Sequence, residues 1–284
     1  MKKITIIAFI LFEVLFASDP ISVDSLYKKQ IGLRSITNLS LLSSGNANIY
    51  NTYPNLSING DLVLWDETKQ LALTQTLIYS LTSSLDIMGT FGGSYVKNEY
   101  TNFRTLEPIS EDRVGFDSIW AGLNYRGDSF SGLVPMINFQ VALFQKERVK
   151  RENKNFNLKS YSIKGSLRGY TDPVIYSIYV GAKYNAERNF GFAKLSYGHN
   201  LYFGGDLSIV LSPKITLDLG IEQGFQTANK LNGKKTTNIR SIPTYNVGST
   251  YSINDDTSIT FSATFGGSSA APDSIFGISL WKKF

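Results

Sequence analysis

Ser274-Ile-Phe-Gly-Ile-Ser-Leu-Trp-Lys-Lys-Phe284 closes the sequence and carries its clearest structural pattern. Counting back by twos from Phe284 gives Lys282, Leu280, Ile278 and Phe276. Because successive side chains of a β-strand point to opposite faces, this stretch predicts a strand with one mainly apolar face. Lys282 interrupts that face, and Trp281 stands beside it as a partial replacement.

The same alternation recurs in three earlier segments, which are Ser160–Gly169, Lys214–Glu222 and Ser258–Phe265. In the second of them, Ile215, Leu217, Leu219 and Ile221 alternate with Thr216, Asp218, Gly220 and Glu222. A period of two over this length predicts strands with one apolar and one polar face. A soluble antiparallel sheet would give the same pattern with its apolar face turned inward.

Three further features favour a membrane barrel with the apolar face outward. The strands run to about 10 residues, the length of a tilted crossing of the hydrocarbon layer. Aromatic residues stand near the strand ends, where interfacial girdles form. These are Tyr79, Tyr95, Tyr125, Tyr184 and Tyr251. Tight turns also alternate with longer polar loops, as they do in barrels of this class.

The turn pattern predicts the number of strands. Tight turns are expected at Leu81–Ser84, Gly127–Gly132, Thr171–Pro173, Ser212-Pro213 and Ile253–Asp256. Longer connections are expected at Asn98–Gly115, Gln145–Leu158, Ala186–His199, Thr227–Thr236 and Gly266–Asp273. With all tight turns on one side, we expect an all-β, antiparallel up-and-down barrel of about 12 strands within residues 49–284. Ile31–Leu42 and Phe190–Ser196 are open as additional strands, which leaves counts of 10 to 14 as alternatives.

The N-terminus has the order of a secretory signal peptide. Lys2 and Lys3 precede the apolar run Ile4–Phe16, which is followed by the small residues Ala17 and Ser18. We therefore expect residues 1–17 to be a signal peptide and residues 18–48 to be an N-terminal segment of the mature chain. The alternative is an uncleaved anchor, although the run is short of the ~20 residues of a spanning helix.

Composition excludes several classes of protein. The 284 residues include no Cys and one His, which excludes disulfide scaffolds, thiolate chemistry and polyhistidine metal sites within one chain. The formal net charge of +5 is too mild to argue for nucleic-acid binding, and no fold signature of that class accompanies it. We expect no cofactor and no metal.

Two resemblances follow from these segments. The terminal Phe284 on an alternating strand resembles the assembly signal of Gram-negative outer-membrane barrels, and Lys282 departs from that pattern. The run Leu71-Ala-Leu-Thr-Gln-Thr-Leu-Ile-Tyr-Ser-Leu-Thr-Ser-Ser-Leu-Asp-Ile87 resembles a strand, turn and strand of the outer-membrane transporter family labelled "meta-pathway of phenol degradation". Asp172-Pro-Val, Gly205-Asp-Leu-Ser-Ile-Val-Leu-Ser-Pro-Lys and the final strand resemble it too. This implies a Gram-negative outer membrane, the barrel-assembly machinery as a partner and passage of small organic molecules.

The polar face of the predicted barrel supplies the candidate pore-lining residues. These are Asp86, Asn124, Asn138, Gln140, Lys164, Arg168, Lys183, Asp218, Glu222, Arg240 and Asn246. We expect the four basic residues to form a ladder opposite Asp86, Asp218 and Glu222, which would impose a transverse field on a water-filled lumen. The alternative is that these groups pair with one another and plug a narrow barrel.

Basic residues also gather in two predicted outer loops. Lys146, Arg148, Lys150, Arg151 and Lys154 belong to the first loop, and Lys230, Lys234 and Lys235 to the second. On the outer side they would gather anionic solutes or pair with lipopolysaccharide phosphates. The alternative is a loop that is charged only for solubility.

Catalysis has little support in the sequence. His199 has Ser196, Ser208 and Asp206 nearby, but no nucleophile motif surrounds them. Asp255-Asp256 and Glu111-Asp112 do not supply the oxygen ligands of a hard cation. Gly92-Gly93 and Gly204-Gly205 lack the residues of a phosphate loop, and we expect them to mark bends or close packing. The sequence thus predicts a passive channel and not an enzyme. The alternative is a structural or adhesive surface protein with a closed lumen and binding loops.

Overall fold

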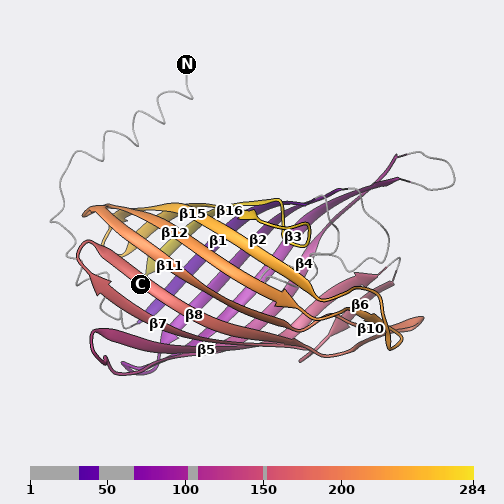
Figure 1. The fold of residues 1–284 in the computed structure, drawn as a ribbon, viewed down its shortest axis with the longest axis horizontal. Helices are drawn as coiled ribbons and strands as arrows, with labels where there is room; N and C mark the ends of the chain where they lie inside the picture. Colours follow the sequence, from indigo (N-terminus) through magenta and orange to yellow (C-terminus); the bar gives the residue numbers. More distant parts are fainter. Residues whose placement is uncertain (1–31, 45–66, 102–107, 150–151) are drawn as a thin grey trace, which may run out of the picture.

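The computed structural model describes residues 32–44, 67–101, 108–149 and 152–284. Its main body is a closed antiparallel barrel of 12 strands (Figure 1). The barrel strands are β1 (Leu33–Ser44), β2 (Glu67–Ser80), β3 (Leu85–Thr101), β4 (Pro108–Arg126), β5 (Leu133–Val149), β7 (Ser160–Thr171), β8 (Val174–Asn185), β11 (Asn200–Ser212), β12 (Ile215–Gln226), β15 (Arg240–Asn254), β16 (Thr257–Gly266) and β17 (Ser274–Lys283). No helix in the described ranges is long and apolar enough to cross a membrane.

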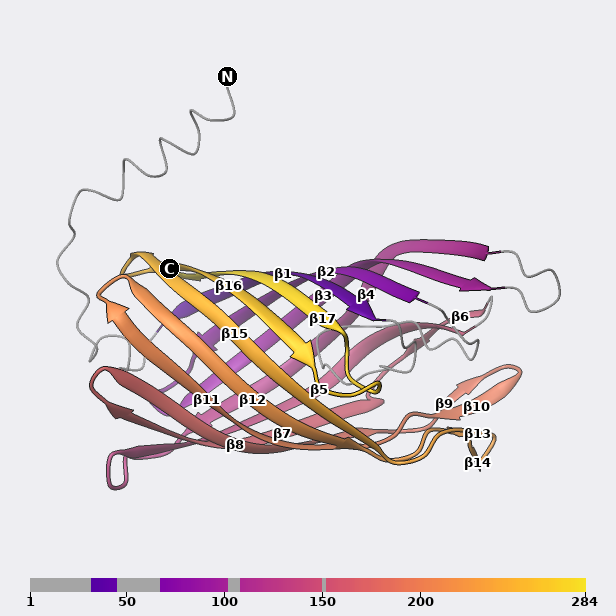
Figure 2. The same cartoon turned by 45° about the horizontal axis from the view of Figure 1, so that its top comes forward.

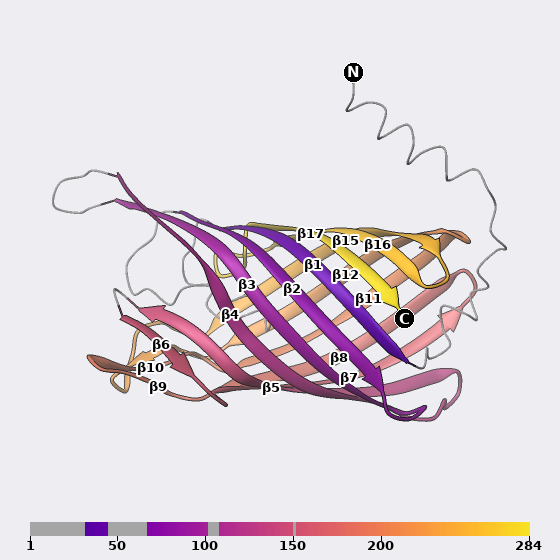
Figure 3. The same cartoon turned by 180° about the vertical axis from the view of Figure 1, so that it is seen from behind.

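The barrel closes between β1 and β17. These strands pair from Arg34 and Lys283 at one end to Ser43 and Ser274 at the other. Every other barrel strand pairs with its neighbours in chain order, and all are tilted against the long axis of the barrel (Figures 2 and 3). Closure leaves no strand edge of the barrel unpaired, which is the condition for a sheet to cross a lipid bilayer.

The predicted fold class and strand count are confirmed, and two open segments receive definite positions. Ile31–Leu42 overlaps β1, so this part of the chain forms a barrel strand. Phe190–Ser196 does not add a barrel strand, because it overlaps two short strands outside the barrel. The predicted signal peptide at residues 1–17 and the predicted barrel start at residue 49 lie outside the described residues.

Five tight turns join strands at one end of the barrel, where the sequence predicts them. Three of them use the same device, in which a side-chain oxygen accepts backbone N–H groups that the turn leaves free. Thr82 Oγ1 accepts from the N–H of Leu85 at 3.0 Å, and Asn254 Oδ1 accepts from that of Asp256 at 3.0 Å. Ser212 Oγ accepts from the N–H of Ile215 at 3.1 Å. The start of β1 and the end of β17 lie at the same end of the barrel.

At the other end the strands extend into a cluster of loops. β3, β4 and β5 have 17, 19 and 17 residues, well beyond a bilayer crossing. The predicted loops Asn98–Gly115 and Gln145–Leu158 are therefore largely strand, including β6 (Glu152–Phe156). A second sheet contains β9 (Arg188–Phe190), β10 (Ala193–Ser196), β13 (Lys230–Leu231) and β14 (Lys234–Lys235).

A small apolar core holds these loops together. The rings of Phe156 and Phe190 meet edge to face with centroids 5.1 Å apart, and Leu195 and Leu231 pack against them. The core therefore joins the β5–β7, β8–β11 and β12–β15 connections into one body. The sequence predicts these connections only as long polar loops, and it does not indicate that they share an apolar core.

The barrel is apolar outside and polar inside. Large apolar side chains are exposed on the outer face of every barrel strand, for example Leu73, Ile137, Ile178, Ile221 and Phe276. The five predicted girdle tyrosines also face outward, as the register with these residues shows. Inward positions carry mostly Ser, Thr, Asn, Gln and charged side chains. This is the reverse of a soluble sheet and fits a barrel surrounded by lipid.

Candidate functional site in the barrel lumen

The strand register places all the predicted pore-lining residues on the inner face. Asn138 on β5 pairs with Lys164 on β7. Gln140 on β5 pairs with Ser162 on β7, which in turn pairs with Lys183 on β8. Asp86 lies opposite Asn124 at the turn end of β3 and β4. The remaining inward residues on β7, β12 and β15 are Arg168, Asp218, Glu222, Arg240 and Asn246. Each alternates with an outward apolar neighbour, which is the signal that placed it.

The charged groups gather on one side of the lumen, which we call the charged wall. It consists of the inward side chains of β7, β8, β11 and β12, with Lys164, Arg168, Tyr179, Lys183, Tyr202, Asp206, Asp218 and Glu222. The opposite strands, β17, β1, β2 and β3, form a hydroxyl wall. Its residues are Asn38, Ser40, Thr68, Thr74, Thr76, Ser80, Thr90, Ser94 and Ser279.

This arrangement corrects the expected basic ladder opposite an acidic row. Lys164 on β7 and Glu222 on β12 lie on the same wall, separated by β8 and β11. Arg240 lies beyond the acidic residues on β15, where it donates to the side-chain oxygen of Gln226. Asp86 is on the opposite side and is paired with Arg34. Alternation defines the face of a strand, but position around the barrel depends on the number of intervening strands.

Tyr179 connects a cation to a carboxylate on the charged wall. Lys164 Nζ lies 3.7 Å from the centre of the Tyr179 ring, and the phenol donates to Glu222 Oε2 at 3.1 Å. The ring has space here because it lies over Gly204, where a Cβ would be 2.6 Å from the Tyr179 oxygen. The predicted close packing at Gly204-Gly205 is therefore present.

The other carboxylates of this wall are held by neutral hydroxyl groups. Ser208 and Thr250 donate to the two oxygens of Asp218, at 2.6 and 2.9 Å. Ser177 donates to Asp206 Oδ2 at 3.3 Å. Asp206 and Arg168 face inward and are nevertheless exposed to solvent. Arg168 lies near the end of β7, and Asp206 pairs with Ser177 near the start of β8, so within the described residues the lumen is accessible to water from its turn end.

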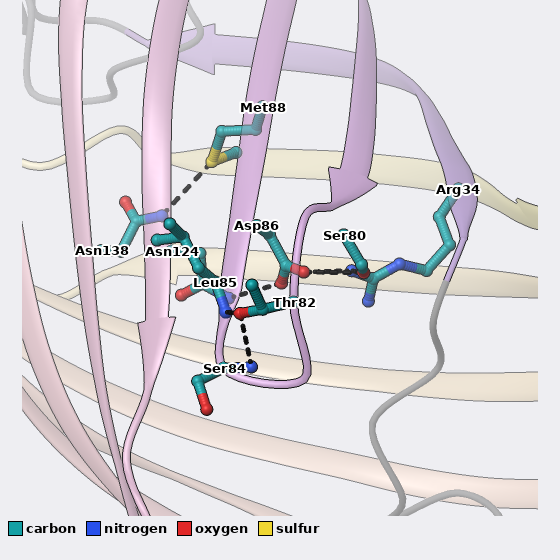
Figure 4. A network of polar contacts seen from close by, with 9 residues as sticks. All are labelled: Arg34, Ser80, Thr82, Ser84, Leu85, Asp86, Met88, Asn124 and Asn138. Atoms are coloured by element: carbon teal, nitrogen blue, oxygen red, sulfur yellow. Dashed lines mark hydrogen bonds and ion pairs between the residues drawn. The ribbon is translucent and has the colours of Figure 1, made fainter.

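A second polar network closes the turn end of β1 to β4 (Figure 4). Arg34 NH2 forms an ion pair with Asp86 Oδ1 at 3.1 Å and donates to Ser80 Oγ at 3.1 Å. Ser80 donates to Asp86 Oδ1 at 2.7 Å, and Asn124 donates to the other oxygen at 3.3 Å. Further along, Asn138 donates to the sulfur of Met88 at 3.3 Å. These contacts tie the first five barrel strands together beside the β1–β17 closure.

The loop end of the lumen is filled by buried polar side chains. Arg188 of β9 reaches back into the barrel, is 0% exposed and donates to Glu147 Oε1 at 2.5 Å. It also donates to Gln145 Oε1 at 3.2 Å and to Ser160 Oγ at 2.9 Å. Lys183 is 2% exposed, with Nζ 5.4 Å from the centre of the Trp120 ring. The lumen is thus narrow at this end and open around Arg168 and Asp206.

The structure describes only part of the predicted outer basic cluster. Lys146 and Lys154 lie on the β5–β6 hairpin and are half-buried. Arg148 belongs to β5 by its backbone, and Lys150 and Arg151 lie outside the described residues. In the second cluster, Lys230, Lys234 and Lys235 form the β13–β14 hairpin and are exposed.

His199 lies at the outer surface of the barrel. Its ring stacks on Tyr184 with centroids 4.6 Å apart and planes 9° from parallel, and Nδ1 accepts from the N–H of Asn185 at 3.3 Å. Asp206 and Ser208 instead face the lumen and hydrogen bond to Ser177 and Asp218. The Ser–His–Asp arrangement considered from the sequence is therefore not assembled. Within the described ranges, no three His, Asp or Glu side chains come together as a metal site.

A groove of about 400 Å³ lies on the outer surface over β8, β11, β12 and β15. Ile178, Phe203, Ile221 and Tyr245 line it, and all four point outward. The groove belongs to the apolar outer surface and is not part of the lumen.

Several site residues were not found from the sequence. Arg188, Gln145 and Trp120 lie in segments without clear alternation or in a predicted loop, so no periodic signal marked them. Tyr179 alternates with Ile178 and Asp206 with Leu207, so the sequence pattern does contain a signal for both inward positions. Arg34 belongs to β1, the segment left open by the strand count.

No family model matches the sequence, and no curated protein matches it. Solved structures that are similar in fold include the following three. The COG4313 outer membrane channel from Pseudomonas putida F1 has a TM-score of 0.65 at 9% identity, over 94% of this chain and 100% of that one. The transport unit of the autotransporter AIDA-I from Escherichia coli has a TM-score of 0.55 at 13% identity, over 95% and 93%. The NanC porin has a TM-score of 0.51 at 9% identity, over 88% and 100%.

Proposed function

We propose that this protein is an outer-membrane channel for the passive passage of small molecules. The observation that carries the proposal is the exposure of Arg168 and Asp206 inside a closed barrel. A water-accessible lumen with polar walls gives hydrophilic solutes a path through the hydrocarbon layer, down their own gradient. No coupling to an energy source is involved in this mechanism, and no catalytic role is assigned.

The apolar outer face supports an outer-membrane location. A closed barrel with aromatic girdles and an apolar belt is stable in lipid, where its backbone groups are all paired. Two of the structures with a similar fold are a channel and a porin by name. We extend the proposal to the partners expected from the sequence, which are lipopolysaccharide at the basic hairpins and the barrel-assembly machinery at β17 with Phe284.

Small organic compounds are the solutes that we propose. The resemblance to the "meta-pathway of phenol degradation" family supports this class, and so does the mixed surface of the lumen. Tyr179 and Tyr202 present rings beside charged groups, with centroids 6.3 Å apart. Aromatic and charged surfaces together suit molecules that have both an organic body and a polar group.

The second candidate is a structural or adhesive surface protein with a closed lumen. The buried cluster around Arg188 and the packed loop core favour it, because both reduce the opening at the loop end. This candidate predicts that the exposed lysines of the β13–β14 hairpin bind a partner. Replacing Lys230, Lys234 and Lys235 with Gln would then abolish surface binding and leave conductance unchanged.

Single-channel recording tests the proposal. The refolded mature chain is placed in a planar bilayer, and heat-shifted mobility on a gel verifies that the barrel has folded. Discrete current steps are the expected result, and the reversal potential in a salt gradient then reports the ion selectivity. Folded protein that carries no current and releases no small solute from vesicles would overturn the channel and favour the second candidate.

A further inference from the structure

Two rows of opposite charge lie side by side on the charged wall. The basic row follows β7 and β8 with Arg168, Lys164 and Lys183. The acidic row follows β11 and β12 with Asp206, Asp218 and Glu222. The four strands are consecutive around the barrel, so the rows run beside each other along the lumen. Adjacent strands are about 4.8 Å apart, so the backbone of β7 is about 10 Å from that of β11 and about 14 Å from that of β12, and long side chains on both rows reach into the lumen between them.

The two rows come closest at Tyr179. The Lys164 ammonium lies over the ring at 3.7 Å from its centre, and the phenol oxygen of the same ring is 3.1 Å from Glu222. A cation and a carboxylate are thus held on either side of one flat ring. The ring lies close over Gly204, which has no side chain to displace it.

The carboxylates of the acidic row accept hydrogen bonds from neutral groups. Their hydrogen-bond donors named above are the neutral hydroxyls of Ser177, Tyr179, Ser208 and Thr250. Neutral donors orient a carboxylate without cancelling its field. Three acidic and three basic side chains make the formal charge of the two rows balanced, while the local field between them remains strong.

Among the described residues, the opposite side of the lumen carries no comparable rows of charge. The hydroxyl wall offers Ser, Thr and Asn side chains, and the charges beside it, Arg34 and Asp86, are paired with each other. A solute with one charge is attracted by one row and repelled by the other. A solute with both charges a few bonds apart is attracted by both rows, and its remaining polar groups can hydrogen bond to the hydroxyl wall.

We propose that the charged wall is a binding track for small zwitterionic solutes. The carboxylate of the solute faces Lys164 and Arg168, and its ammonium faces Asp206 and Glu222. This inference rests on the proposed channel function and adds the class of solute to it.

The test compares four probes of similar size and different charge. Vesicles containing the purified barrel are loaded with glycylglycine (zwitterion), N-acetylglycine (anion), glycylglycinamide (cation) and N-acetylglycinamide (neutral). The release of each is followed by mass spectrometry. We expect glycylglycine to leave about threefold faster than the other three, because only it is attracted by both rows.

Single-charge variants reverse the preference in opposite directions. Lys164→Gln should favour the cation, Glu222→Gln should favour the anion, and each should lose the advantage of glycylglycine. Lys69→Gln and Asp112→Asn are matched controls, because they remove the same charges from exposed positions on the outward face of β2 and β4. Gel mobility verifies that every variant is folded.

The outcomes separate the two proposals. If the wild-type barrel releases all four probes at one rate, or if the inward variants behave like the controls, the zwitterion track is wrong and the channel stands. If vesicles with folded wild-type protein release none of the probes faster than loaded vesicles without protein, the proposed channel function itself is wrong.

Discussion

Arg188 and Glu147 join a loop to the inside of the barrel through a hydrogen bond of 2.5 Å between Nε and Oε1. Arg188 belongs to β9, outside the barrel, and Glu147 lies on the inner face near the end of β5. Both side chains are buried, at 0% and 7% exposure. The position of the loop cluster over the lumen therefore depends on an ion pair that is shielded from solvent.

Removing one member of this pair should be costly. Arg188→Ala leaves the Glu147 carboxylate buried without its cation, with an expected loss of about 3–5 kcal/mol in unfolding free energy. We expect higher single-channel conductance as well, because the side chain no longer fills the loop end of the lumen. Urea unfolding in lipid vesicles and planar-bilayer recording measure the two effects. The double variant Arg188→Ala with Glu147→Ala should recover part of the stability, and an equal or larger loss would contradict the role of the pair.

Gly204 should tolerate no side chain. A Cβ there would clash with the backbone oxygen of Ile221 and lie 2.6 Å from the Tyr179 oxygen, so Gly204→Ala strains the β11–β12 pairing and displaces the ring from its hydrogen bond to Glu222. The expected cost is about 1–3 kcal/mol, as for other overpacked sites. Gly165→Ala is the matched control, since nothing lies within 4 Å of its added Cβ. Equal unfolding midpoints for the two variants would show that Tyr179 is not held by this contact.

Neutralising the basic row should alter ion selectivity. Lys164→Gln with Arg168→Gln removes two positive charges from the lumen and leaves the acidic row in place. We expect the permeability of cations relative to anions to rise about twofold or more. The reversal potential in a potassium chloride gradient measures this ratio. An unchanged reversal potential, equal to that of Lys69→Gln, would mean that ions do not pass the charged wall.

Asp86 should stabilise the barrel near the seam, which is the pairing of β1 with β17 that closes it. Asp86→Ala leaves Arg34 without its carboxylate at a position where the side chains are 15% and 4% exposed. A loss of about 3 kcal/mol is expected from breaking a pair buried to this extent. The temperature at which gel mobility shifts should fall. Asp128→Asn, in the exposed turn between β4 and β5, is the control and should leave that temperature unchanged.

The periodic part of the structure was accessible from the sequence. Lys164 and Asp218 alternate with apolar neighbours, and in a barrel whose apolar face is turned to lipid this places them on the inner face. The tight turns were found because Ser, Thr, Asn, Gly and Pro serve turn geometry through local contacts. Both signals depend on residues within a few positions of each other.

Contacts between distant strands were not accessible in the same way. Arg188 meets Glu147 across 41 positions of sequence, and Arg34 meets Ser80 across 46. The residues around Arg188 and Arg34 give no indication of which distant residue each side chain contacts. The side-by-side rows of the charged wall were missed for the same reason, because the order of strands around a barrel is a property of the closed sheet.

The seam between β1 and β17 has a consequence for biogenesis. Ser279 donates to Asn38 across 241 positions of sequence, and ten residue pairs join the two strands. During translation β1 leaves the ribosome long before its partner exists, and its edge stays ready to join any other strand that it meets. The chain is therefore exposed to premature strand pairing until the ring closes. The β1 edge remains open to misassembly until β17 arrives and completes the ring.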